Sequence, residues 1–247
     1  MGVSGYCVPM NYQYALIIPA LNEAETIGSL LRQIPANLFS QIIVVDNGSR
    51  DATSEIALAA GAQVVREPRR GYGQACISGL EQLKPSINAV VFMDADLSDD
   101  PQDLERLIRL FGQSYWDMVM GSRVLGSAEK GALTPIQRFG NWLTTRLIVL
   151  LWKVHFTDLG PLRILRRDSL ERLKLQDRTY GWNVEMQAKA AQLGLKTCES
   201  PVNYRQRQSG QSKISGSISG SFRAGVKILW TVYRCWRNPL PAKSTDI

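Results

Sequence analysis

The stretch "VVFMDADLSDDP", Val90 to Pro101, joins an apolar run to a cluster of acidic residues. The apolar run predicts a buried strand, and the carboxylates that follow it are Asp94, Asp96, Asp99 and Asp100. In an extended chain residues i and i+2 point to the same side, so Asp94 and Asp96 can face one ligand together. A bound divalent cation would cancel their mutual repulsion. Two carboxylates without His or Cys favour Mg²⁺ or Mn²⁺, completed by water and phosphate.

A solvated turn before a capped helix is the alternative for the same residues, because Asp-x-Asp is a short and common pattern. Asp99 and Asp100 fit that alternative. They precede Pro101, which favours the first position of a helix, and they are expected to cap a helix over 101–111.

The first half of the chain alternates short apolar segments with amphipathic ones. Strands are predicted over 14–19, 41–46, 62–67, 88–93 and 117–123, and helices over 23–34, within 47–61, and over 71–83 and 101–111. Asn22 is expected to cap the first helix and Gly61 to close the second. Uninterrupted apolar strands separated by helices indicate βαβ units. The predicted fold is therefore α/β and Rossmann-like, with a mostly parallel sheet covered by helices on both faces.

Polar residues follow several of these strands. They are Pro19 to Glu23, Asp46 to Ser49, and Asp94 with Asp96. In parallel sheets, ligands bind outside the carboxyl ends of the strands. We therefore expect these residues to meet at one edge of the sheet, which favours the metal site over the solvated turn.

After Arg123 the alternation gives way to a longer helix over 135–154 and to shorter pieces. Strand-like segments cover 162–167 and 196–207, and further helices are predicted over 182–193 and 221–236. No internal repeat or linker is visible. We predict a single domain over 1–247, with a first half over about 14–123, a second half over about 124–220, an amphipathic helix over about 221–237 and a tail over 238–247.

Two of the predicted helices are amphipathic. The first places Leu143, Leu147, Leu150, Leu151 and Val154 on one face, with Arg138, Arg146 and Lys153 around it. The last places Phe222, Val226, Leu229, Trp230 and Tyr233 on one face, beside Arg223, Lys227 and Arg234, and ends with Trp236 and Arg237. Basic residues beside an apolar, aromatic face are typical of helices that lie on anionic lipid. An ordinary core-facing helix is the alternative for both.

The chain of 247 residues has a net charge of +7, and from Glu199 onward eight Lys or Arg stand against two acidic residues. Such a balance suggests phosphate-bearing partners: a nucleotide, a nucleic acid or an anionic membrane surface. We expect no nucleic acid, because the basic residues accompany apolar helix faces and no nucleic-acid motif appears. No apolar run approaches the ~20 residues that span a bilayer, and the opening lacks the pattern of a secretory signal. The expected location is cytoplasmic.

Several segments together resemble the family 2 glycosyltransferases of the GT-A fold. They are "LIIPALNEAETI", "IIVVDNGSRDAT", "RRGYGQA", "VVFMDADLSDDP" and "MGSR", in that order. The later "YGWNVEMQAKAAQLG" and "YRQRQSGQSK" are similar to the dolichol- or polyprenyl-phosphate mannosyltransferase group. The resemblance, from about Tyr14 to Gly220, implies inverting, metal-dependent transfer of a hexose from a nucleotide sugar of the GDP-mannose or UDP-glucose type to a polyprenyl phosphate. It also implies peripheral association with the inner face of a membrane, a nucleotide-sugar half before residue 124 and an acceptor half after it.

The resemblance also implies roles for the matching positions. The residues expected to bind the nucleotide are Pro19, Glu23, Asp46, Gly71, Gly73 and Asp94. The two glycines would allow the backbone to approach the nucleotide closely, and a plain turn is the alternative for them. The residues expected to bind the metal are Asp94 and Asp96. Many polyprenyl-phosphate enzymes carry Gln at the position of Ser98 as a further metal ligand, and because serine is shorter, Ser98 is expected to reach the metal through water. The acceptor phosphate falls to Arg123, Arg205, Arg207 and Lys213, since Arg binds phosphate in bidentate fashion and Lys supplies a point charge.

The chemistry of the acceptor leaves alternatives open. A lipid phosphate is ionised at neutral pH and can attack without a base, whereas a hydroxyl needs one within hydrogen-bond reach. Asp158, in "TDLGPLR", is the candidate for that base, or else it orders the acceptor loop. The alternative function is therefore transfer to a hydroxyl of a lipid or polysaccharide, with Asp158 catalytic. A nucleotidyltransferase would need a basic loop after the first strand, where "PALNEAET" is acidic.

Overall fold

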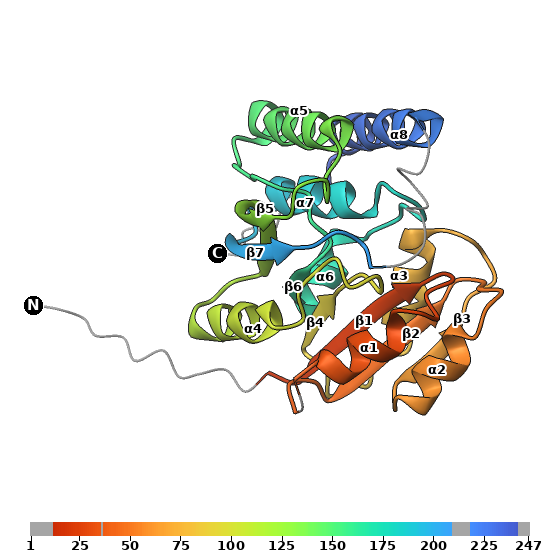
Figure 1. Ribbon diagram of the computed structural model, residues 1–247. Coiled ribbons are helices and arrows are strands. Elements are labelled where there is room, and N and C mark those ends of the chain that lie inside the picture. The colour runs from red at the N-terminus through yellow and green to blue at the C-terminus, as the bar shows by residue number, and fades with distance from the viewer. Residues whose placement is uncertain (1–11, 36, 209–217, 242–247) are drawn as a thin grey trace, which may run out of the picture.

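The computed structural model describes residues 12–35, 37–208 and 218–241, with side chains from 223 onward in the last range. Within these residues one seven-stranded sheet has the order β3-β2-β1-β4-β6-β5-β7 (Figure 1). Its strands are β1 (Tyr14–Ala20), β2 (Gln41–Asp46), β3 (Gln63–Arg66), β4 (Ala89–Phe92), β5 (Met118–Ala128), β6 (Arg163–Arg166) and β7 (Thr197–Tyr204). Strand β6 runs antiparallel to β4 and β5, and the other pairs are parallel. The predicted α/β fold with a mostly parallel sheet is confirmed.

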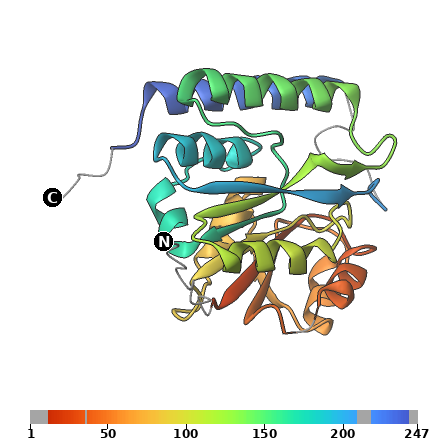
Figure 2. The same cartoon turned by 90° about the vertical axis from the view of Figure 1, so that its left-hand side faces the viewer.

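Helices cover both faces of the sheet. One face carries α1 (Ile27–Gln33), α2 (Thr53–Ala59) and α4 (Asp103–Gln113), and the other carries α3 (Tyr72–Leu80), α6 (Arg167–Leu173) and α7 (Trp182–Gln192). A further layer, α5 (Pro135–Trp152) and α8 (Ile218–Arg237), lies outside α7, and its two helices run side by side (Figures 1 and 2). We call these two helices the α5–α8 layer.

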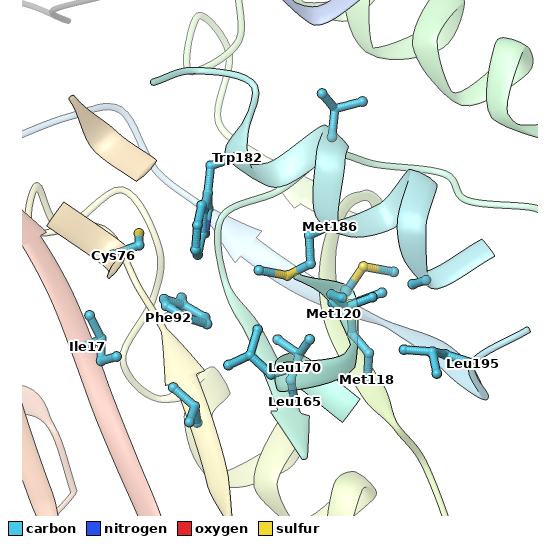
Figure 3. Packing of buried hydrophobic residues seen from close by; sticks show 14 of the residues in the cluster. Ile17, Cys76, Phe92, Met118, Met120, Leu165, Leu170, Trp182, Met186 and Leu195 are labelled. Atoms are coloured by element: carbon cyan, nitrogen blue, oxygen red, sulfur yellow. The ribbon is translucent and has the colours of Figure 1, made fainter. Parts of the chain in front are cut away.

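The core consists of two apolar clusters, one on each side of the sheet. Neighbouring residues of β1 alternate between them: Ile17 belongs to the cluster under α3 and α7, and Leu16 and Ile18 belong to the one under α1 and α4. Because both faces are buried, the strand is apolar throughout, as its sequence shows. In the first cluster the rings of Phe92 and Trp182 lie edge to face with centroids 6.1 Å apart (Figure 3).

Some predicted details are wrong. Asn22 does not cap α1, which begins at Ile27; it has a positive φ of 51°. Its side chain accepts a hydrogen bond from the backbone N–H of Arg50 at 2.8 Å, so it ties the loop after β1 to the loop after β2. Helix α4 begins at Asp103, two positions beyond Pro101. Helix α6 was not predicted at all, because it follows β6 without an intervening turn.

The two amphipathic helices differ in where their apolar faces point. In α5, Leu147, Leu151 and the following Val154 pack against the core cluster beneath α7, as in the core-facing alternative. The exposed apolar residues of α5 are instead Ile136, Phe139, Trp142 and Leu150. In α8 the predicted face is exposed at Val226, Leu229, Trp230 and Tyr233, while the side chain of Phe222 lies outside the described residues. Over the described ranges, every helix is too short or too polar to cross a bilayer.

Candidate functional site

The register of the sheet brings the polar strand ends together. Ile17 pairs with Phe92, and therefore Pro19 is level with Asp94 two residues further along both strands. On the other side of β1, Ala20 pairs with Asp46. Glu23 follows directly and is 6% exposed. The expected meeting of these strand ends is confirmed, and we call Pro19, Glu23, Asp46, Asp94 and Asp96 the strand-end cluster.

Asp94 and Asp96 are both partly exposed, on either side of the buried Ala95. Oδ1 of Asp94 accepts a hydrogen bond of 2.9 Å from the hydroxyl of Tyr72. Burial, followed by repulsion from Asp96, raises the pKa of Asp94 to about 7. Oδ1 of Asp96 accepts hydrogen bonds from the backbone N–H of Ser98 at 3.0 Å and from its hydroxyl at 2.5 Å. Ser98 is therefore positioned to orient Asp96.

The donor set of this pair suits a hard divalent cation. Among the described residues no group of three or more His, Cys, Asp or Glu side chains is arranged to hold a metal ion. The protein thus offers two carboxylates with the Ser98 hydroxyl beside them, the pattern by which Mg²⁺ or Mn²⁺ binds through one or two carboxylates and takes its other ligands from water and phosphates. A divalent cation would also stabilise the charged form of Asp94, which the protein alone disfavours.

Asp99 lies behind the pair and does not cap α4. It is 1% exposed, and among the described residues neither carboxylate oxygen has a hydrogen-bond partner. Burial and the charges of Asp94 and Asp96 raise its pKa well above the usual value. Asp100, by contrast, accepts a hydrogen bond of 3.1 Å from the backbone N–H of Gln102, just before α4. The expected capping role is wrong for both residues, because α4 has Gln102 at its N-cap position without a side-chain cap, and Asp100 instead closes the turn before the helix.

A hollow of about 370 Å³ lies where β2 and β3 end, lined in part by Asp46, Ser49 and Glu67. Asp46 accepts hydrogen bonds from the N–H of Ser49 at 2.7 Å and the hydroxyl of Ser54 at 2.5 Å. Burial raises the pKa of Asp46, but these hydrogen bonds lower it more. Glu67 was missed from the sequence, although it stands at the end of the third predicted strand. Hydrogen bonds from Arg69 and then from Ser78 and Gln74 outweigh burial and lower its pKa.

The two glycines before and after Tyr72 are required by another part of the chain. A Cβ on Gly71 would lie 2.1 Å from the carbonyl oxygen of Arg178, and one on Gly73 would lie 2.0 Å from that of Asp177. Gly71 also has a φ of 146°, which disfavours residues with a side chain. The close approach that these glycines allow is thus an approach of the 177–178 backbone to the start of α3.

Arg123, in the middle of β5, forms a buried pair with Asp158. The guanidinium donates two hydrogen bonds of 2.7 Å to the carboxylate, and the backbone N–H of Arg123 donates a third at 2.8 Å. The N–H of Leu159 adds another at 2.8 Å. Burial raises the pKa of Asp158, but these bonds and the charge of Arg123 lower it more. A carboxylate held in this way is a weak base.

The other predicted phosphate ligands also contact carboxylates. Arg205 lies 2.6 Å from Oδ2 of Asp100, and its backbone N–H donates to the carbonyl oxygen of Ser98 at 2.8 Å. Arg207 contacts Glu23, and its Nε lies 3.3 Å from Oδ2 of Asp96. The end of β7 is therefore joined to the strand-end cluster. Lys213 lies outside the described residues.

A larger groove begins at Arg123 and extends between the helices of the α5–α8 layer. Its volume is about 860 Å³. The lining is mainly apolar and includes Phe139, Trp142, Phe156, Tyr180 and Leu229. We call it the α5–α8 groove. The groove therefore combines apolar walls with the guanidinium of Arg123 on β5.

Comparison with known proteins identifies the family. Residues 15–174 match the model of the glycosyl transferase family 2. An uncharacterised glycosyltransferase of Mycobacterium tuberculosis is 36% identical over 218 residues, which cover 88% of this chain and 96% of the relative. An undecaprenyl-phosphate mannosyltransferase of Micrococcus luteus is 31% identical over 219 residues, 83% of this chain and 88% of the relative.

Solved structures agree on the fold. The glucosyl-3-phosphoglycerate synthase of Mycobacterium tuberculosis, crystallised with Mn²⁺, UDP-glucose and phosphoglyceric acid, superposes with a TM-score of 0.72. It is 21% identical, and the match covers 93% of this chain and 81% of that one. The chain described here belongs to glycosyltransferase family 2 and is a glycosyltransferase.

Proposed function

We propose that this family 2 glycosyltransferase moves a hexose from a nucleotide sugar, of the GDP-mannose or UDP-glucose type, to a polyprenyl phosphate. The observation that carries the proposal is the α5–α8 groove: a mainly apolar channel whose lining includes Arg123. Arg123 is also close enough to Asp94 of the strand-end cluster for its charge to favour the ionised form of that carboxyl. A phosphate on a long apolar chain matches both parts of the groove. A polysaccharide hydroxyl would not need an apolar channel of about 860 Å³, and a lipid hydroxyl would not need the guanidinium of Arg123 in its lining.

For the donor, we propose that the hollow lined by Asp46 and Glu67 takes the nucleoside, with Pro19 and Glu23 beside it. Gly71 and Gly73 would contribute by holding the start of α3 in place. Asp94 and Asp96 would hold Mg²⁺ or Mn²⁺ on the diphosphate. The Mn²⁺ and UDP-glucose in the synthase structure support this assignment by similarity of fold.

For the acceptor, we propose that the phosphate binds near Arg123, Arg205 and Arg207, with Lys213 as a further candidate. Arg123 lines the groove, Arg207 contacts Glu23 and Asp96 of the strand-end cluster, and Arg205 contacts Asp100, four residues beyond Asp96. The relative from Micrococcus luteus, named an undecaprenyl-phosphate mannosyltransferase, supports a polyprenyl phosphate. The isoprenoid chain would lie in the α5–α8 groove.

In the proposed reaction, an ionised phosphate oxygen attacks the anomeric carbon as the bond to the diphosphate breaks, and its electron pair leaves with the diphosphate. A single displacement inverts the anomeric configuration. Bound to Asp94 and Asp96, the metal would act as a Lewis acid for the leaving group. No general base is needed because the phosphate is already ionised. Asp158 would keep Arg123 in place, since its pKa is lowered and both its oxygens accept hydrogen bonds.

We further propose that the α5–α8 layer docks on an anionic membrane at its inner face. Its exposed apolar residues include Phe139 and Trp142 on α5 and Trp230, Tyr233 and Trp236 on α8. Exposed basic residues such as Arg138, Arg146 and Arg223 lie on the same two helices. Aromatic and basic side chains together are typical of helices at a lipid interface.

The test is transfer of radiolabel from GDP-mannose and from UDP-glucose into polyprenyl phosphate, with Mg²⁺ or Mn²⁺. We expect an acid-labile, organic-extractable product with one of the donors, abolished by EDTA. Asp96→Ala should lower its rate about a thousandfold, because a metal ligand contributes several kcal/mol to transition-state stabilisation. Asp168→Asn, in an exposed ion pair with Arg166, is the control. Label appearing only in hydroxyl acceptors would reject the proposal in favour of the alternative with Asp158 as base.

A further inference from the structure

The hydroxyl group of Tyr72 is directed at the pair of carboxylates. It donates a hydrogen bond of 2.9 Å to Oδ1 of Asp94, across 22 residues of sequence. We propose that Tyr72 is a positioning residue that fixes the Asp94 carboxylate for the metal ion. The inference rests on the proposed function, because the metal belongs to that function.

Asp94 and Asp96 are oriented by different means. Asp96 receives its donors locally, from the backbone and hydroxyl of Ser98. Asp94 has no such neighbour: in the part of the chain that the structure describes, Tyr72 is the group found hydrogen-bonded to its carboxylate. A donor on Oδ1 stops rotation of the carboxylate and leaves Oδ2 for the metal. Partners of this kind fix the direction of metal ligands in proteins.

Tyr72 can perform this role because its own backbone is held on both sides. Gly71 and Gly73 lie so close to the carbonyl oxygens of Arg178 and Asp177 that neither has room for a Cβ. The N–H of Gln74 donates to the carbonyl oxygen of Arg178 at 2.9 Å. The ring of Tyr72 packs against the core cluster that contains Phe92 and Trp182. Neither the main chain nor the ring is free to move the hydroxyl away.

The 177–178 segment is itself anchored. The carboxylate of Asp177 is buried and accepts hydrogen bonds from the N–H groups of Thr179 at 2.9 Å and Gly181 at 3.2 Å. Lys227 of α8 lies 2.8 Å from its other oxygen. A series of contacts therefore leads from α8 through Asp177 and the start of α3 to Tyr72. The hydroxyl is held by the fold as a whole, as a group that positions a metal ligand must be.

The test is Tyr72→Phe, which removes the hydroxyl and keeps the ring. Mn²⁺ affinity is measured by electron paramagnetic resonance of free Mn²⁺, first with saturating UDP and then with GDP. We expect the Kd for Mn²⁺ to rise about 10- to 100-fold, with the thermal midpoint nearly unchanged. Transfer should fall at low Mn²⁺ and recover at high Mn²⁺. Tyr14→Phe is the matched control, because Tyr14 begins β1 at the end of the sheet away from Asp94.

An unchanged Mn²⁺ affinity in Tyr72→Phe would overturn the inference, whatever happens to activity. A clear fall of Tm together with the loss of Mn²⁺ affinity, and no recovery of transfer at high Mn²⁺, would also overturn the inference, because the hydroxyl would then have a structural role. The measurement needs no lipid acceptor. A wild-type protein that binds Mn²⁺ and nucleotide but glycosylates no polyprenyl phosphate would refute the proposed function alone, and the comparison of the two Tyr variants would still decide the role of Tyr72.

Discussion

The two sides of the site are built in different ways. In the strand-end cluster two carboxylates are held by donors close by in sequence: Asp96 by Ser98, two residues on, and Asp46 by Ser54, eight residues on, whereas Asp94 is held by Tyr72 across 22 residues. The arginines proposed for the acceptor phosphate, which we call the groove side, form pairs that join distant segments. Arg123 and Asp158 are 35 residues apart, and Arg207 and Glu23 are 184 apart.

The two kinds of contact therefore stabilise different parts of the structure. For Asp96 and Asp46 the same short segment of chain supplies both the carboxylate and the group that holds it. Long-range ion pairs hold the second half of the chain against the first, and they do so with groups that are also the proposed phosphate ligands. The stability of the groove side should therefore depend on single pairs, whereas the strand-end side should tolerate the loss of one donor.

The strongest test of this comparison is Asp158→Asn. The Asp158 side chain is 1% exposed and that of Arg123 13%, so the variant leaves a buried guanidinium without its counter-charge. We expect the free energy of unfolding at pH 7 to fall by about 3–5 kcal/mol in urea denaturation. Asp168→Asn, whose carboxylate is 64% exposed, should cost about 1 kcal/mol or less. Equal losses in the two variants would show that the buried pair does not hold the groove side.

The same pair predicts a pH dependence. The folded-state pKa of Asp158 is lowered, so its contribution is fully present above the unfolded value of about 4 and is lost as the pH falls through the folded value. The stability difference between the wild type and Asp158→Asn should therefore be constant from pH 5 to pH 7 and narrow below about pH 4. A difference that narrows above pH 5 would contradict the sign of this shift.

A smaller effect is expected on the outer face of the groove side. In the double variant Trp230→Ser and Tyr233→Ser, two exposed rings of α8 lose their apolar surface. Partition onto phosphatidylglycerol vesicles, measured by sedimentation, should fall on the order of 10- to 100-fold. Mn²⁺ affinity with UDP or GDP should stay the same. The control is Leu58→Ser with Tyr115→Ser, which removes exposed apolar groups that lie outside the α5–α8 layer. Equal partition of both double variants would reject the layer as the lipid-binding face.

The contrast also explains what the sequence could predict. The strands, the parallel order and the strand-end cluster follow from local patterns, because apolar runs end in polar residues at each carboxyl end. Glu67 belonged to the same pattern, because it ends the third predicted strand, and it was missed because only the polar residues after the first, second and fourth strands were considered. Asn22 was misassigned because a polar residue before a helix usually caps it, and here its amide ties two loops together.

The groove side was harder to predict because its contacts are long-range. No spacing indicates that Asp158 binds Arg123, or that the glycines of "GYGQA" make room for the 177–178 backbone. In α5, periodicity identified an apolar face but not which of two apolar faces meets the core. Leu147 and Leu151 pack inward, and Phe139 and Trp142 remain exposed. Burial decides between them, and burial depends on tertiary packing.

The smallest effect is expected on the strand-end side, in Ser98→Ala. Oδ1 of Asp96 accepts two hydrogen bonds from Ser98, and the variant removes the hydroxyl donor but keeps the backbone N–H. One net hydrogen bond is worth about 0.5–1.5 kcal/mol, so Mn²⁺ affinity should fall only about 2- to 12-fold. Ser54→Ala, which removes the equivalent hydroxyl from Asp46, should leave Mn²⁺ affinity unchanged.

The size of the Ser98→Ala effect distinguishes two roles for this serine. A loss within that range means that Ser98 orients Asp96 and that the backbone donor is enough to keep the carboxylate in place, as the comparison between the two sides requires. A loss above about 100-fold would equal or exceed that of a positioning group and would make Ser98 a ligand of the metal, directly or through water. In that case the strand-end side would depend on a single donor as strictly as the groove side depends on Asp158, and the difference between the two sides would disappear.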